Sequence, residues 1–501
     1  MKSQQQYDSL VVFRSILVAC LASGLTAACS GGKASNNTQA GTGGSKQDPS
    51  TETGGAGGKQ TPIPASGGAG GHVDAPGTDA AATGGASGAG GAGGVITPPG
   101  TGGTPAISGG AGGSAPDGGA NLDGSAIPDP HASDAASGSS FLHVEGNKLL
   151  DGRGKNVRLT GVNWFGLETN NQSPHGLWAR DYRSMVKQIA DLGFNTIRLP
   201  WANQILRTGA TAASVNTTGV DPYDTTITEM NKALVGKSPL EIMDKVIEAA
   251  GEFGVKIILD NHSREPDGYM NEQVWYTDKT SEKQWIDDWV FLAKRYAGNT
   301  AVVAADLDNE PHGIASWGTG DTSTDWNTAA EKCGNAILAV NPDWVIVVEG
   351  TEKVGTDSYW WGGNLSGVKT HPIKLTNMSK LMYSTHEYGP EVHDQDWFSD
   401  ASFPGNLPAL WASKFDFIMQ QNLGHILIGE FGIKDRTADG GKAGVWFDTV
   451  LSKLGTTYSW TFWCWNPNSG DTEGILTYDW TTPVQWKIDA LKPAMAPMIG
   501  K

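Results

Sequence analysis

From about Phe141 to the C-terminus, short apolar runs alternate with longer segments in which apolar residues recur every three or four positions. Short apolar runs bounded by turn residues are typical of buried strands, whereas the longer spacing is typical of amphipathic helices. The pattern predicts eight strands, at 156–164, 196–200, 255–260, 302–308, 344–350, 381–386, 426–430 and 459–465.

The segments between these runs carry helix signals. In "SPLEIMDKVIEAAGEF", Ser238 can cap a helix, Pro239 fits its first position and Glu241 completes a capping box. A second apolar stripe of helical spacing covers residues 182–192. Eight strands alternating with helices favour a (β/α)₈ TIM barrel over an open doubly wound sheet, and such barrels carry their chemistry at the C-terminal strand ends.

The first 140 residues have a different composition. No aromatic residue occurs between Phe13 and Phe141, and all 19 tryptophans lie from Trp164 onward. Residues 1–28, basic and then apolar, predict a secretory signal peptide. Residues 29–139 are rich in Gly, Ala, Ser and Pro and predict a disordered tether, because they offer too little apolar surface to fold. Residues 140–501 are then expected to form one catalytic-sized barrel domain.

Four cysteines divide between the leader and the barrel. Cys29 in "LTAACSGG" resembles the lipidated cysteine of a bacterial lipoprotein, and Cys20 in "LVAC" is the second candidate. We therefore expect an exported chain, either a lipid-anchored surface protein or, after plain cleavage, a secreted one. Cys333 and Cys464 fall in a predicted helix and a predicted strand, and we expect two buried free thiols.

The formal charge of −17 argues against nucleic acid or an anionic membrane surface as a partner, since both require a positive surface. A neutral ligand suits the chain better. We expect a monomer whose only membrane contact is the N-terminal lipid.

Two carboxylates stand at predicted strand ends, Glu310 in "DLDNEPHG" and Glu430 in "HILIGEFGIK". Retaining glycoside hydrolysis requires one carboxyl group as acid and another as nucleophile. Glu310 has fewer cationic neighbours and is the expected proton donor, whereas Glu430 should lie near Arg198 and Tyr388, which favour an ionised nucleophile. Ordinary ion pairs at strand ends are the alternative.

Aromatic and polar residues near the other strand ends suggest a glycan cleft, because flat rings stack on sugar faces. The candidate platforms are Trp164, Trp360, Trp361, Trp463 and Trp465, with core packing as the alternative, and Gln395 and Asp471 are weaker candidates for sugar hydrogen bonds. His262, His312 and His386 lack zinc-ligand spacing, so we expect neither a metal nor a cofactor.

Six ordered motifs resemble glycoside hydrolase family 5, the cellulase family A group, and are most similar to its bacterial endoglucanases. They are "GFNTIRLPW", "ILDNHS", "DNEPHG", "STHEYGP", "ILIGEFG" and "WTFWCWNPNSGDTEGIL". The resemblance implies Glu310 as acid/base, Glu430 as nucleophile and retaining endo-hydrolysis of β-1,4-glucan. It also implies active-site positions for Arg198, His262, Asn309, His386, Tyr388 and Trp463.

Two other functions remain open on the sequence. The same catalytic set could act on another β-1,4-linked glycan, such as mannan, xyloglucan or mixed-linkage glucan, because only the cleft walls would differ. A non-catalytic glycan-binding surface protein would need the aromatic platforms but not both glutamates. A purely structural envelope lipoprotein would not explain why acids and aromatic residues collect at the strand ends.

Overall fold

The computed structural model describes residues 141–500 except 210, 213, 269 and 270. The predicted signal peptide (1–28), the tether (29–139) and Cys29 lie outside the described residues. Across the part that is described, no helix is both long enough and apolar enough to cross a membrane. Cys333 and Cys464 are buried free thiols, as predicted.

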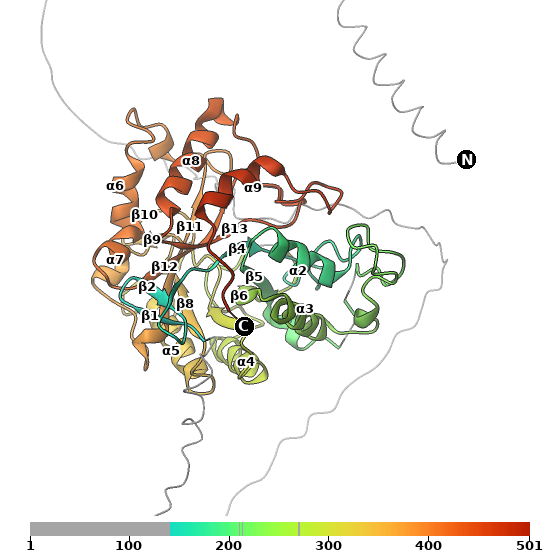
Figure 1. Cartoon of the computed structure of the whole chain (residues 1–501). Coiled ribbons are helices and arrows are strands. Elements are labelled where there is room, and N and C mark those ends of the chain that lie inside the picture. The colour runs from blue at the N-terminus through green and yellow to red at the C-terminus, as the bar shows by residue number, and fades with distance from the viewer. Residues whose placement is uncertain (1–140, 210, 213, 269–270, 501) are drawn as a thin grey trace, which may run out of the picture. The chain divides into compact units, whose positions relative to one another are not determined.

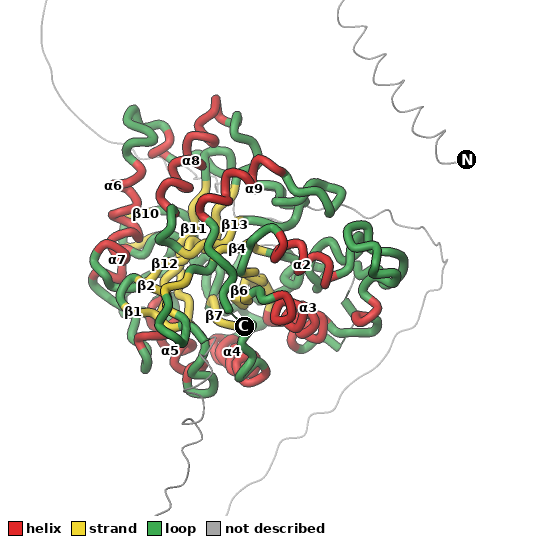
Figure 2. Tube along the Cα trace, in the orientation of Figure 1, coloured by secondary structure: helices red, strands yellow, loops and turns green. Residues whose placement is uncertain are grey.

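Eight parallel strands close into a barrel in chain order, which confirms the predicted (β/α)₈ fold. Figure 2 shows these strands gathered at the centre with helices around them. The barrel strands are β4 (Thr160–Asn163), β5 (Thr196–Ala202), β6 (Lys256–Ser263), β7 (Val302–Asp306), β8 (Val345–Glu349), β11 (Leu381–Tyr388), β12 (His425–Gly432) and β13 (Ser459–Phe462).

All eight predicted strands differ from the structure by one to a few residues at their ends, and two of these differences have a structural reason. The segment 156–164 divides into β3 (Asn156–Val157), which belongs to a small antiparallel sheet, and the barrel strand β4. Strand β13 ends at Phe462 although apolar residues continue to 465, because Trp463, Cys464 and Trp465 are buried by packing outside the strand ladder.

The helices cover the outside of the barrel (Figure 1). They are α2 (Tyr182–Asp191), α3 (Pro239–Phe253), α4 (Glu282–Arg295), α5 (Trp326–Leu338), α6 (Leu407–Trp411), α7 (Phe417–Gln420), α8 (Lys442–Leu454) and α9 (Gln485–Leu491), with a π-helical turn at Ala412–Asp416. Shorter 3₁₀ turns lie at Asn203–Leu206, Lys232–Leu234, Ser366–Lys369, Met378–Lys380, Asp396–Phe398, Asp439–Gly441 and Lys492–Ala494. Helix α3 begins with the predicted capping box between Ser238 and Glu241.

The barrel interior changes from apolar to polar along the strand direction. Near the N-terminal ends, Ile258, Val345 and Val347 pack with other strand residues and with the hairpin of β1 (His143–Glu145) and β2 (Lys148–Leu150). Because side chains alternate along a strand, the same inward rows end in acids, as in Val345, Val347 and Glu349. The apolar base and the polar rim place the chemistry at the C-terminal ends.

A second small sheet lies in the segment after β8. Strands β9 (Lys353–Val354) and β10 (Asp357–Ser358) form an antiparallel pair. This pair precedes Trp360 and Trp361.

Candidate active site

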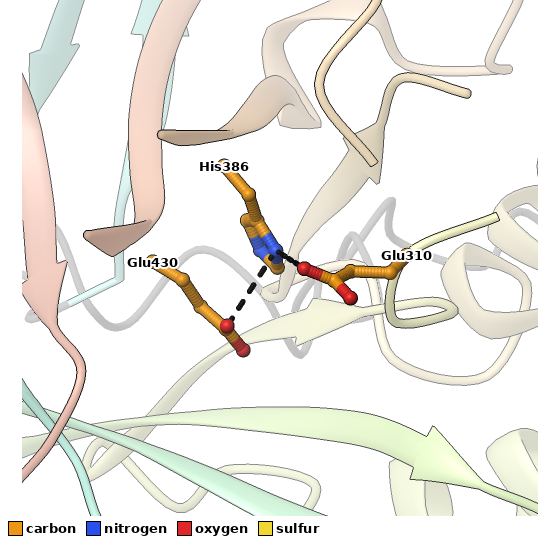
Figure 3. A group of neighbouring side chains, drawn as sticks. All are labelled: Glu310, His386 and Glu430. Atoms are coloured by element: carbon orange, nitrogen blue, oxygen red, sulfur yellow. Dashed lines mark hydrogen bonds and ion pairs between the residues drawn. The ribbon is translucent and has the colours of Figure 1, made fainter. Parts of the chain in front are cut away.

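The structure brings the predicted catalytic residues to the C-terminal ends of the barrel strands. Arg198 lies in β5, His386 in β11 and Glu430 in β12, while Glu310 lies in the segment that follows β7. In Figure 3, the His386 ring stands between the two glutamate carboxylates.

The two carboxylates lie close together. His386 Nδ1 is 2.8 Å from Glu310 Oε1 and 3.7 Å from Glu430 Oε2. One oxygen of each glutamate and one nitrogen of His386 all lie within 4.8 Å of one another. Retaining glycosidases hold their carboxyl groups about 5–5.5 Å apart, whereas inverting enzymes need about 6.5–9.5 Å to admit a water. The separation therefore fits retention.

Glu430 receives two strong hydrogen bonds. Arg198 Nη1 donates to Glu430 Oε1 at 2.7 Å, and the Tyr388 hydroxyl donates to Oε2 at 2.6 Å. Burial and the adjacent Glu430 charge raise the pKa of Tyr388 well above its usual range, so the phenol remains a donor. Donors of this kind favour the ionised carboxylate that a nucleophile requires.

Glu310 has a less polar environment. His386 contacts its Oε1, whereas its buried Oε2 finds no hydrogen-bond partner among the described residues. Burial raises the pKa of Glu310 to about 7, against the opposing effect of the hydrogen bond to His386. A carboxyl group with this pKa can carry a proton near neutral pH and release it in a reaction.

Arg198 is the centre of a buried charge cluster. Its guanidinium contacts Asp306, Glu349 and Asp260 at 2.8, 3.0 and 3.0 Å, in addition to Glu430. It also donates to the side-chain oxygens of Asn163 at 3.1 Å and Asn309 at 2.9 Å. Burial opposes its charge, yet these acids together raise the pKa of Arg198 well above its usual range. Arg198 thus stays cationic beneath the catalytic pair.

His262 supplies a second positive charge. Its Nδ1 lies 2.7 Å from Asp260 Oδ2. Burial lowers the pKa of His262, but Asp260 and then Glu430 and Glu168 outweigh burial and raise it to about 9. The His262 ring stacks on Trp463 with 5.5 Å between ring centroids.

Trp463, Trp360 and Trp361 lie in different surroundings. Trp463 donates from Nε1 to Ser469 Oγ at 3.3 Å and also stacks on Phe165. Trp360 is buried against Tyr388. Trp361 is half-buried and stacks on His312 with 3.7 Å between centroids.

Trp164 and Trp465 do not have the surroundings that the sequence analysis expected. Both are 0% exposed, so neither ring has a free face on which a sugar could stack. Trp164 Nε1 donates to the His175 carbonyl at 2.9 Å, and Trp465 Nε1 points at Met185 Sδ. Both rings pack in the core of this structure, and substrate binding by Trp164 and Trp465 stays an untested prediction.

Gln395 and Asp471, the weaker candidates, are both half-buried. Gln395 precedes the 3₁₀ turn Asp396–Phe398. Burial and the nearby Glu430 raise the pKa of Asp471, which places that carboxyl group within the field of the nucleophile.

Three acids of the cluster were not singled out from the sequence, namely Asp260, Asp306 and Glu349. Each lies in or at the end of an otherwise apolar strand, within "VKIILD", "VVAAD" or "VIVVE". This is the same signal that identified Glu430, and it was available at all three positions.

Glu310, His386 and Glu430 are also a group that could hold a metal ion, because each offers one ligand atom. The ligand atoms of this group are already engaged within the protein, because Arg198 and Tyr388 donate to Glu430 and His386 Nδ1 is hydrogen-bonded to Glu310.

Comparisons with known proteins agree with this geometry. Residues 150–469 match the family described as cellulase (glycosyl hydrolase family 5). An endoglucanase from Paenibacillus polymyxa is 44% identical over 377 residues, which cover 74% of this chain and 91% of that protein. The major extracellular endoglucanase of Xanthomonas campestris is 40% identical over 366 residues, which cover 71% and 72% of the two chains. The endocellulase of Pyrococcus horikoshii, solved as a complex with cellotetraose, has a TM-score of 0.64 at 37% identity and covers 71% of this chain and 98% of its own.

Proposed function

Because this chain belongs to glycosyl hydrolase family 5, the cellulase family, we propose that Glu310 and Glu430 cleave its substrate with retention. The chain is a glycoside hydrolase, an endo-β-1,4-glucanase that acts within a polysaccharide. The observation that carries the catalytic assignment is the pair of carboxylates within 4.8 Å in unlike environments.

In the first step, Glu430 attacks the anomeric carbon of a glucose unit and forms a glycosyl ester. The bond to the departing sugar oxygen breaks, and Glu310 transfers its proton to that oxygen. Arg198 and Tyr388 hold the Glu430 carboxylate in place, and their hydrogen bonds fix which oxygens are engaged before attack.

In the second step, Glu310 has become a carboxylate and accepts a proton from a water molecule. The resulting oxygen attacks the anomeric carbon, the ester bond to Glu430 breaks, and the sugar leaves with its original configuration. The pKa of Glu310, raised to about 7 by burial, suits both the donation and the uptake of this proton.

Substrate binding is assigned to residues beside the pair. The exposed part of Trp361 and the accessible edge of Trp463, which is 3% exposed, are proposed platforms. Asn309 and Asp471 are proposed partners of sugar hydroxyls. Gln395 is retained as a further polar contact and Trp360 as a support for Tyr388.

The test is release of reducing sugar by the full chain from soluble cellulose, mannan, xylan and mixed-linkage glucan in parallel. We expect cellulose to be cleaved fastest and Glu430→Gln to be inactive, while Glu248→Gln on the exposed surface of α3 leaves the rate unchanged. NMR of the first product should show the β-anomer. Cleavage by Glu430→Gln, or an initial α-anomer, would refute the catalytic assignment.

The same assay separates the alternatives. A faster rate on another β-1,4-linked glycan would keep the mechanism and change the substrate. Binding without cleavage by the wild-type chain would favour a glycan-binding surface protein.

We further propose that the chain is exported and held at the cell surface by lipid on Cys29, with residues 29–139 as a tether to the barrel. The leader sequence supports this proposal, as does the similarity to an extracellular endoglucanase. The wild-type chain should incorporate labelled palmitate and partition into detergent, and Cys29→Ala should do neither. Labelling that persists in Cys29→Ala and disappears in Cys20→Ala would move the site to Cys20.

A further inference from the structure

Glu349 is a fully buried acid that the catalytic steps do not use. It ends β8, and its side chain contacts three parts of the site. Its Oε2 accepts the backbone N–H of Glu310 at 2.8 Å, and its Oε1 accepts Arg198 Nη2 at 3.0 Å. The same Oε1 lies 3.2 Å from His386 Nε2, although the two atoms do not form a hydrogen bond. His386 thus has Glu349 beside one ring nitrogen and Glu310 beside the other.

The backbone of Glu310 needs such support. Its backbone φ is +52°, in the left-handed region that residues other than glycine rarely adopt. A non-glycine residue in that region is strained and persists only where its surroundings hold it. The N–H that Glu349 accepts belongs to this same residue, so the bond fixes the strained peptide.

Gly362 shows how tightly this contact is enclosed. A Cβ on Gly362 would lie 2.3 Å from Glu349 Oε2 and 3.2 Å from Glu310 Cα. Gly362 follows Trp361 directly, and its carbonyl accepts the N–H of Gly350 at 2.8 Å. Gly362 therefore packs directly against the contact between Glu349 and Glu310, and a larger residue there would push the Glu349 carboxyl group away.

We propose that Glu349 is the positioning residue of the acid/base: it holds the Glu310 backbone in its left-handed conformation through its hydrogen bond to the Glu310 N–H. This inference rests on the proposed role of Glu310 as proton donor. Burial raises the pKa of Glu349 well above its usual range, and Arg198 and the Glu310 N–H act against that rise.

Glu349→Gln tests the inference, because glutamine keeps the shape but has only one acceptor oxygen. Its NH₂ group must face either Arg198 Nη2 or the Glu310 N–H, and both are donors, so one contact is lost. Loss of acid positioning should matter only where the leaving group needs a proton. We expect kcat/KM for cellotetraose to fall about 10- to 100-fold, and that for 2,4-dinitrophenyl β-cellobioside to change less than about 3-fold.

Two further variants keep the test decisive. Gly362→Ala keeps the Glu349 side chain but crowds its contact with Glu310, because the new Cβ would lie 2.3 Å from Glu349 Oε2 and 3.2 Å from Glu310 Cα at a residue with φ +64°. It should give the same dependence on the leaving group, even if Glu349→Gln fails to fold. Glu387→Gln is the matched control, because Glu387 is also a buried acid with a raised pKa but contacts Tyr359 and Trp411. Both rates should be unchanged in Glu387→Gln.

The outcomes are distinguishable from failure of the catalytic assignment. Glu310→Gln must itself show the dependence on the leaving group, and if it does not, the assignment of the acid fails and this inference with it. If Glu310→Gln shows the dependence but Glu349→Gln or Gly362→Ala loses both activities equally, or loses neither, the positioning role alone is overturned.

Discussion

Replacement of His386 by phenylalanine should move the alkaline limb of the kcat/KM profile to higher pH. Burial raises the pKa of Glu310 to about 7, and the hydrogen bond from His386 opposes that rise by stabilising the ionised carboxylate. Phenylalanine fills a similar volume without a donor. Burial then acts unopposed, and the pKa of Glu310 should rise further.

The size of the shift follows from the bond that is lost. A hydrogen bond to a charged group contributes about 1.5–3 kcal/mol, and one pKa unit corresponds to about 1.4 kcal/mol. The expected rise is therefore about 1–2 units. The first catalytic step needs protonated Glu310, so activity is lost as the pH passes above its pKa, and the limb should move from about 7 to about 8–9.

The assay is kcat/KM for cellotetraose between about pH 5 and pH 10. With 2,4-dinitrophenyl β-cellobioside the alkaline limb should be weak in both proteins, since that leaving group departs without a proton. His386→Asn is the matched variant, because its amide N–H can occupy the place of Nδ1–H and should bring the limb back toward the wild-type position. A limb in His386→Phe that stays in place or moves to lower pH would refute the proposed acid.

Three further outcomes can be measured. Tyr388→Phe removes a charge-assisted hydrogen bond to Glu430, worth about 1.5–3 kcal/mol, and should lower kcat/KM about 10- to 150-fold on activated and natural substrates alike; a loss confined to the natural substrate would contradict the assignment of the nucleophile. Burial raises the pKa of Glu387 from 4.5 to about 8, so its contribution to stability is present below pH 4.5 and lost as the pH rises through 8. Urea unfolding across this range should show that decline in the wild type and a flatter profile in Glu387→Gln. Trp361→Ala should raise KM for cellotetraose about 3- to 10-fold with kcat nearly unchanged, whereas His312→Ala, which removes only the supporting ring, should have a smaller effect on KM.

The barrel could be predicted because its strands are short apolar runs separated by helices with clear start signals. Two strand bounds were wrong where apolar residues serve a purpose other than pairing. At 156–164 the run covers two strands of different sheets, and beyond Phe462 it continues into buried tryptophans. A run of apolar residues indicates that a segment is buried, but it does not show whether the segment is a strand or a packed loop that follows one.

The candidate site shows the same limit at the level of side chains. An acid that ends an apolar strand is costly to bury, and this signal brought out Glu430 before any contact was known. The direction of a ring cannot be read in the same way: Trp463 reaches His262, whereas Trp465, two residues on, lies in the core. Contacts such as Arg198 with Glu349 join strands far apart in sequence and emerge only when the barrel closes.

The unlike behaviour of the two catalytic carboxyl groups arises from how the barrel distributes donors and not from distance. Both are buried within a few ångströms of each other, so neither burial nor distance distinguishes them. Glu430 receives donors on both oxygens, one of them from a cation. Glu310 has a donor on one oxygen only, and its other oxygen is bare among the described residues. A donor added near the Glu310 carboxyl group would stabilise its charged form and reduce its ability to protonate a sugar.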